Sequence, residues 1–145
     1  MWITRKTDYA TRAVLTLALA GEETLLKLDE IAERAAIPRP FLEQIMTQLR
    51  GDGIVRSERG PSGGYRLNHP PGQITLERIV RLFQGPLAPI ACATRTNPEA
   101  CPMGVSCALR ETWETVREAT IEILHATDFA TLAARSGGRW VSAVG

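Results

Sequence analysis

The sequence predicts a mainly α-helical fold with one small β-hairpin, and three observations support this prediction. Three short apolar stripes at helical spacing follow one another within the first 51 residues. Two short runs of strand-forming residues then flank a glycine-rich tip between residues 54 and 67. A longer stripe with spacings of four and three residues begins at residue 109. The order helix, helix, helix, hairpin is that of a winged helix-turn-helix, here followed by a long C-terminal dimerisation helix.

The first three helices have recognisable ends. The first is expected to begin after Asp8 and to stop at Gly21. The second has acidic residues in its first turn and is closed by Pro38. The third follows Pro40 and ends at Gly51. The apolar positions that define these helices are, in chain order, Tyr9, Ala10, Ala13, Val14, Leu17, Leu28, Ile31, Ala32, Ala35, Leu42, Ile45, Met46 and Leu49.

The segment after the third helix changes character. Ile54–Ser57 and Tyr65–Leu67 are expected to form two strands, and residues 58–64 between them form a flexible, glycine-rich tip. A proline-containing connector at 68–72 leads to a fourth helix, for which Thr75 is the expected N-cap. The apolar positions of this helix are Leu76, Ile79, Val80 and Phe83.

The C-terminal part contains the longest stripe in the sequence. Its members are Leu109, Trp113, Val116, Thr120 and Ile123. Because so small a domain cannot cover this stripe, we expect a two-fold dimer to bury it; the alternative is that the helix packs back on its own domain. The expected organisation is a winged helix-turn-helix domain at 1–84, an aperiodic cysteine-containing loop at 85–107, the dimerisation helix and its end at 108–134, and a flexible tail at 135–145.

Composition excludes several classes of protein. The chain of 145 residues has 17 basic and 16 acidic side chains, so its net charge gives no bulk attraction for nucleic acid. Its longest apolar stretch, Ala13–Ala20, is far below the ~18–20 residues that a bilayer needs, and no signal peptide is visible. We therefore expect a cytoplasmic protein without a membrane partner. No hydrolase, zinc-protease or phosphate-loop motif is present, and the two histidines leave little general-base chemistry, so no enzyme is expected.

The outward face of the third helix is rich in hydrogen-bonding side chains. In a helix-turn-helix this face enters the major groove of DNA. Glu43 can accept a hydrogen bond from cytosine, and Gln44 can pair with adenine. The alternative is an ordinary solvated face. The polar residues of the face are Arg39, Glu43, Gln44, Thr47 and Gln48.

The tip of the hairpin also suits DNA. Arg59 lies beside glycines and a proline that have no apolar side chain to bury, so it is presented outward. Narrow minor grooves concentrate negative potential and attract arginine. The alternative is an ordinary exposed hairpin with a stray arginine. We assign Arg59, Ser62 and Tyr65 of this wing to the DNA contact, together with Arg39, Glu43, Gln44 and Thr47 of the helix.

All three cysteines of the chain, Cys92, Cys101 and Cys107, fall within sixteen residues. Their odd number and the reducing compartment argue against a disulfide framework. Thiolates in a polar loop select zinc, copper(I) or an iron–sulfur cluster, and the close Cys-x2-4-Cys pairs usual for zinc are absent. An inert loop or a simple thiol switch is the alternative.

The sequence resembles the Rrf2 family of bacterial transcription regulators over nearly its whole length. The resemblance is carried by Ile3–Ala10, by Phe41–Gln44 with Leu49-Arg50 and Gly53–Val55, and most specifically by the arginine-led glycine wing Arg59–Tyr65. Members include iron–sulfur biogenesis regulators, nitric-oxide sensors, iron-response regulators and cluster-free regulators of cysteine metabolism. Membership alone therefore leaves the signal open.

The resemblance implies an iron–sulfur cluster held by Cys92, Cys101 and Cys107, of either the [2Fe-2S] or the [4Fe-4S] type. Arg110 stands where the biogenesis regulators have a histidine ligand, so that ligand set is not reproduced. In the nitric-oxide sensors an aspartate donated by the partner subunit serves as fourth ligand, and Asp8 matches its position. Asp8 can instead be a simple helix-start acid that stabilises the dipole.

These expectations combine into a homodimeric transcription regulator that binds a pseudo-palindromic operator in double-stranded DNA. An iron–sulfur cluster that senses iron–sulfur status, nitric oxide or redox state would control operator binding. Two alternatives stay open: a cluster-free thiol-redox regulator of the same fold, and a winged-helix adaptor that binds protein rather than DNA.

Overall fold

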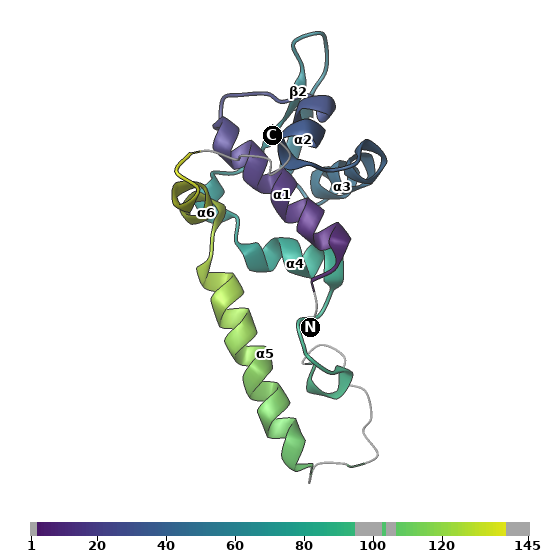
Figure 1. Cartoon of the computed structure of the whole chain (residues 1–145), viewed down its shortest axis with the longest axis vertical. Helices are drawn as coiled ribbons and strands as arrows, with labels where there is room; N and C mark the ends of the chain where they lie inside the picture. Colours follow the sequence, from purple (N-terminus) through teal and green to yellow (C-terminus); the bar gives the residue numbers. More distant parts are fainter. Residues whose placement is uncertain (1–2, 95–102, 104–106, 139–145) are drawn as a thin grey trace.

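The structure, a computed structural model, describes residues 3–94, 103 and 107–138. Figure 1 shows an elongated molecule in which the longest helix extends away from a bundle of shorter ones. The elements are α1 (Arg5–Ala20), α2 (Leu28–Ala35), α3 (Arg39–Gly51), β1 (Val55–Glu58), β2 (Gly64–Leu67), the 3-10 turn η1 (Pro71–Gln73), α4 (Leu76–Gln84), the 3-10 turn η2 (Ala91–Ala93), α5 (Ala108–Ala126) and α6 (Phe129–Arg135). The predicted winged-helix fold is confirmed.

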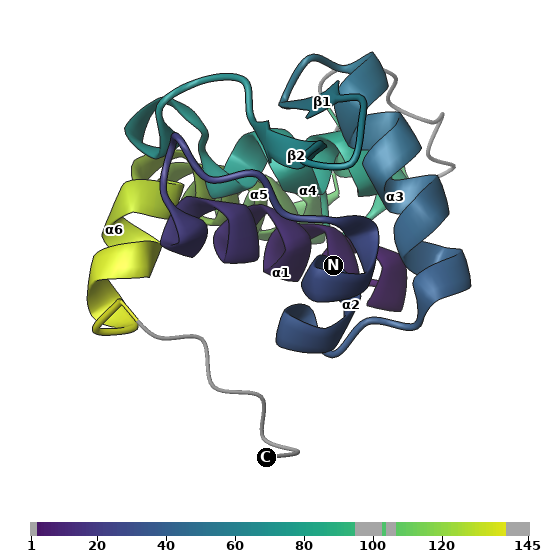
Figure 2. The ribbon, with the colours of Figure 1, turned by 90° about the horizontal axis from the view of Figure 1, so that it is seen from above.

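The apolar stripes predicted for the short helices meet in one core. Helix α1 packs against α2, α3, α4 and α6, and Figure 2 shows it crossing the middle of the bundle. Burial of each leucine or isoleucine in this core contributes about 1.5–3 kcal/mol. The apolar face of α3 is therefore fixed inward, which leaves its polar face outside. Fully buried members are Ala10, Ala13, Val14, Ile31, Leu42, Ile45, Met46, Leu49, Ile54 and Ile79.

Helix α1 starts earlier than the sequence pattern predicts. Thr4 is its N-cap, and the Thr4 hydroxyl accepts a hydrogen bond from the backbone N–H of Thr7 at 3.2 Å. The predicted start after Asp8 is therefore wrong, because the capping threonine precedes the first apolar position of the stripe. Asp8 consequently lies in the first turn of the helix.

Two glycines allow close backbone approaches, Gly63 within the tip of the wing and Gly64 between the wing and the body. Strands β1 and β2 pair antiparallel from Val55 opposite Leu67 to Glu58 opposite Gly64. A Cβ atom on Gly63 would lie 2.1 Å from the carbonyl oxygen of Glu58, and one on Gly64 would lie 2.6 Å from that of Leu26. Only glycine fits such close backbone approaches. The wing is thereby anchored at its base, while its tip projects into solvent.

Helix α6 is not predicted by the sequence pattern. Asp128 caps it by accepting a hydrogen bond from the backbone N–H of Thr131 at 2.8 Å, and Phe129 is fully buried against the core. The N–H of Leu76 donates to the carbonyl oxygen of Thr127 at 2.8 Å. The segment expected to be the dimerisation helix and its end therefore contains two helices, and the second returns to the core. Within the described part of the chain, no helix is long and apolar enough to cross a membrane.

Candidate functional site

Helix α3 presents a polar face to solvent. Arg39, Glu43, Gln44 and Thr47 are all exposed, opposite the buried apolar face. Gln48, which the sequence pattern also places on this face, is half-buried, and its Nε2 donates to the carbonyl oxygen of Leu82 in α4 at 3.1 Å. Gln48 thus holds α3 against α4 and is not free to face a ligand.

Two side chains of the exposed face are already ordered by neighbours. The guanidinium of Arg39 pairs with Asp29 of α2 and lies 3.4 Å from Oε1 of Glu43. The Thr47 hydroxyl donates to the backbone carbonyl of Glu43 at 2.8 Å. Only the Arg39 contact reaches the Glu43 carboxylate, and because both side chains are exposed it orients the carboxylate without burying it.

The wing lies beside α3, which contacts β1. Arg59 and Ser62 are exposed at its tip. Tyr65 is half-buried against the core, and its backbone forms a bridge to Leu26 with bonds of 2.8 and 3.0 Å. At the other end of α3, Nη1 of Arg50 lies 3.4 Å from the hydroxyl of Ser57 in β1. The C-terminal end of α3 therefore adjoins the wing, and the wing lies at the opposite end of the molecule from the first turns of α5 (Figure 1).

The long stripe lies uncovered on α5 in the single chain. Leu109 is 62% exposed, Val116 41% and Ile123 66%, and Trp113 is also exposed. Thr120 is half-buried, and its hydroxyl donates to the carbonyl of Val116 at 2.8 Å. Large apolar side chains at these exposures are what an oligomer interface leaves open in an isolated subunit.

The described cysteines lie at the two ends of the cysteine-containing loop. Cys92 is in η2 and Cys107 is the N-cap of α5; both are half-buried and neither is in a disulfide. Cys101 lies outside the described residues. Among residues that the structure describes, no group of three His, Cys, Asp or Glu side chains is placed to hold a metal ion. Two free, partly accessible thiols nevertheless offer the soft donors that an iron–sulfur cluster requires.

Asp8, the expected fourth ligand, is ion-paired within its own chain. Its carboxylate lies 2.7 Å from Arg12 Nη2, one turn further along α1, and is 43% exposed. The guanidinium of Arg12 also lies over the ring of Tyr9, 5.7 Å from the ring centroid. An exposed i,i+4 pair is worth only ~0.3–0.5 kcal/mol, so the Asp8 carboxylate remains available to a ligand from outside.

Charged side chains connect α5 to the body at two places that sequence reasoning missed. Near the end of α5, His125 Nδ1 lies 2.8 Å from Oε2 of Glu77 in α4, while Arg81 Nε donates to the other carboxylate oxygen at 2.8 Å. Burial alone would raise the pKa of Glu77, but the bonds and charges of Arg81 and His125 outweigh it and hold the pKa below its ordinary value. The second place is Arg117, which is 9% exposed and binds the backbone of η2.

The chain matches, over residues 3–135, the sequence pattern of a family described as Rrf2, iron-dependent transcriptional regulator. It belongs to the Rrf2 family. An HTH-type transcriptional regulator of Mycobacterium tuberculosis is 36% identical over 134 residues, which cover 92% of this chain and 81% of the relative. The regulator CymR of Bacillus subtilis is 33% identical over 138 residues, which cover 95% of this chain and 94% of CymR.

Solved structures of this family share the fold. The structure of B. subtilis CymR, described as the global cysteine regulator, matches with a TM-score of 0.81 at 32% identity, over 93% of this chain and 98% of CymR. That of T. potens IscR matches with a TM-score of 0.76 at 27% identity, over 94% of this chain and 88% of IscR. The protein is thus an Rrf2-family transcriptional regulator and not an enzyme. Iron and cysteine both appear in these descriptions, so the comparisons leave the signal undecided.

Proposed function

We propose that this Rrf2 protein is a homodimeric regulator whose binding to double-stranded DNA is controlled by an iron–sulfur cluster. The observation that carries the DNA part is the exposed polar face of α3 next to the arginine-tipped wing. Helix-turn-helix proteins place such a helix in the major groove, and arginine favours the narrow minor groove beside it.

Each polar side chain of this surface has a distinct role in the proposal. Glu43, whose carboxylate is oriented by Arg39, accepts a hydrogen bond from cytosine, and Gln44 pairs with adenine. Arg59 enters the minor groove, and Ser62 beside it donates to a phosphate. Tyr65 is assigned to the same surface, and its half-buried ring supports the base of the wing.

The exposed stripe of α5 supports the homodimer. Two copies related by a two-fold axis would cover Trp113, Val116 and Ile123 of both chains. Such symmetry presents two α3 helices and two wings to a pseudo-palindromic operator. The interface assigned by the proposal comprises Leu109, Trp113, Val116, Thr120 and Ile123.

The cluster would be held by Cys92, Cys101 and Cys107, with Asp8 of a second copy as the fourth ligand. The two described cysteines are free and half-buried, and their thiolates match the preference of iron–sulfur clusters for soft ligands. When bound, the group would supply a centre that is sensitive to iron supply, nitric oxide and oxidation, in a protein expected to work in the cytoplasm. What this chain itself contributes is the fixed position of Cys107 at the first turn of the dimer helix.

A second candidate function is a cluster-free thiol-redox regulator of the same fold. The free thiols of Cys92 and Cys107 favour it, as does the similarity to CymR, described as a global cysteine regulator. A protein-binding adaptor, the third expectation, would not need Arg59 or Glu43 for its interaction.

Spectroscopy of protein purified without oxygen separates the first two candidates. If the protein holds a cluster, it should show a visible charge-transfer absorption and contain stoichiometric iron and sulfide. Replacing any of Cys92, Cys101 or Cys107 with Ala should remove the absorption, the iron and the sulfide. Asp8→Ala should leave a cluster with an altered spectrum or oxygen lability. Wild-type protein without iron, whose operator affinity still changes on thiol oxidation, would establish the cluster-free form.

A further inference from the structure

Arg117 is a buried arginine on the side of α5 that faces η2. It is 9% exposed, whereas the apolar residues along the stripe of the same helix are exposed. Its Nη2 and Nε lie 2.7 and 3.0 Å from Oε1 of Glu118. A guanidinium that is nearly removed from water must use its donors, because an unpaired buried charge is costly.

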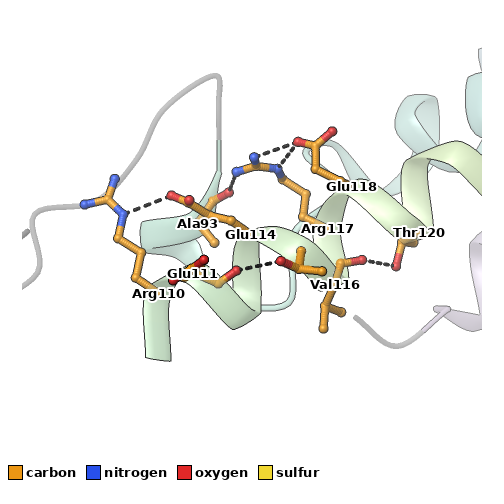
Figure 3. A network of polar contacts seen from close by, with 9 residues as sticks. Ala93, Arg110, Glu111, Glu114, Val116, Arg117, Glu118 and Thr120 are labelled. Atoms are coloured by element: carbon orange, nitrogen blue, oxygen red, sulfur yellow. Dashed lines mark hydrogen bonds and ion pairs between the residues drawn. The ribbon is translucent and has the colours of Figure 1, made fainter. Parts of the chain in front are cut away.

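The remaining described bond of Arg117 goes to the cysteine-containing loop. Its Nη1 donates to the backbone carbonyl of Ala93, which is the residue after Cys92 and is itself buried (Figure 3). The N–H of Ala93 is already bonded to Ile90 at 3.1 Å within the turn. Arg117 therefore satisfies a backbone carbonyl of η2 from α5. This bond fixes η2, the turn that contains Cys92, against α5.

Arg117 also borders the exposed stripe. Together with Val116 and Thr120 it lines a pocket of about 140 Å³ between α5 and the segment Leu87–Pro89. Val116 and Thr120 belong to the apolar stripe of α5. One side chain thus touches both the turn that holds Cys92 and the wall of the surface at which a second copy is proposed to bind.

We propose that Arg117 is a positioning residue that fixes Cys92 and transmits a change at Cys92 to the dimer face of α5. This inference rests on the proposed function in giving Cys92 a regulatory role. Ligation or alkylation of Cys92 displaces η2, the Ala93 carbonyl leaves the guanidinium, and Arg117 repositions beside Val116 and Thr120. Arg117 itself binds no iron and no DNA.

The first test measures the alkylation rate of each cysteine by peptide mass spectrometry, in the reduced, iron-free, full-length chain. Arg117→Gln removes the guanidinium, and we expect Cys92 to react about tenfold faster. This factor corresponds to a loss of ~1.4 kcal/mol in the free energy that protects Cys92 from the reagent. Cys107 in the same sample is the internal reference and should change little. Arg117→Lys, which keeps one charged donor, should restore part of the protection.

Arg110→Gln is the matched control. Arg110 lies on the same helix and pairs with Glu114 at 3.0 Å, as Arg117 pairs with Glu118. This control should leave the Cys92 rate unchanged. Equal Cys92 rates in Arg117→Gln and Arg110→Gln would overturn the positioning role, and so would equal acceleration of Cys92 and Cys107, which would indicate general loosening of the fold.

The second test measures the transmission without DNA or iron. Trp113 emission is recorded in full-length protein in which Phe replaces the other two tryptophans and Ser replaces Cys101 and Cys107, before and after alkylation of Cys92. Alkylation should shift the emission with Arg117 present and with Arg110→Gln, but not with Arg117→Gln. A shift that survives Arg117→Gln would contradict the coupling. A failure of the proposed function would give a different result. Wild-type protein would then bind neither operator nor iron, while the Cys92 alkylation rates and the Trp113 emission would still change as expected here.

Discussion

At the scale of single residues, the polar side chains of α3 divide into those that hold the helix and those left for a ligand. Gln48 bonds the backbone of α4, whereas Glu43 and Gln44 remain exposed. On the wing, Tyr65 anchors the base and Arg59 stays in solvent at the tip. Substitutions at Arg59 and Glu43 should therefore change DNA binding without disturbing the core.

Arg59→Ala should weaken operator binding by about 1–3 kcal/mol, because it removes the exposed charge that we propose to enter the minor groove. Gel-shift titration at fixed salt measures the change. Arg135→Ala, which removes an equal charge from the exposed end of α6, is the control and should have little effect. Unchanged affinity in the Arg59 variant would remove the wing from the DNA contact.

Glu43→Ala should change which bases are preferred more than it changes affinity, because an acid in the major groove selects cytosine by accepting a hydrogen bond from its amino group. Selection from a randomised duplex library measures the preference. Because Arg39 pairs with both Glu43 and Asp29, Asp29→Ala controls for release of that arginine. A uniform loss of affinity across sequences, or the same altered preference in both variants, would count against base reading by Glu43.

Glu77 gives the stability of the protein a defined pH dependence. Its pKa in the folded protein is lowered, so its contribution is fully present above its ordinary value of 4.5 and is lost as the pH falls through the lowered one. Glu77→Gln should cost about 1 kcal/mol of unfolding free energy at neutral pH, since its partners are partly exposed, and the cost should diminish as the pH falls below 4.5. Urea unfolding at constant protein concentration measures it, with Glu122→Gln on the exposed side of α5 as control. A cost independent of pH would show that the ion pairs contribute nothing.

At the scale of elements, α5 is built to have two different sides. One face carries the exposed apolar stripe, and the flank beside it carries Arg117 against η2. The helix ends where Asp128 caps α6, which returns to the core through Phe129. The base of α5 is therefore held by the body, while its first turns, which begin at Cys107, extend away from it (Figure 1).

Val116→Glu or Ile123→Glu should convert the protein to monomers, because each places like charges on both sides of a two-fold interface. Sedimentation velocity measures the change. Glu122→Lys alters charge on the same helix away from the stripe and should leave the dimer intact. A dimer that persists in both stripe variants would place the interface elsewhere.

At the scale of the whole molecule, the wing that we propose to contact DNA and the first turns of α5 lie at opposite ends (Figure 1). The helices and hairpin could be predicted because their periodicity and turn residues are local signals. Helix α6 was missed because its cap, Asp128, directly follows the stripe of the preceding helix. The positions of Gln48 and Arg117 could not be predicted, because their partners Leu82 and Ala93 are 34 and 24 residues away in the sequence.

The most direct test of whether a cluster controls DNA binding is to compare the operator affinity of the protein with the cluster bound and with the cluster removed. Protein purified without oxygen is titrated against an operator selected from random duplexes, before and after the cluster is removed with a chelator and oxidant and the thiols are reduced again. The account predicts affinities that differ by tenfold or more, a coupling of at least ~1.4 kcal/mol. Equal affinities of the iron-loaded and iron-free forms would contradict it.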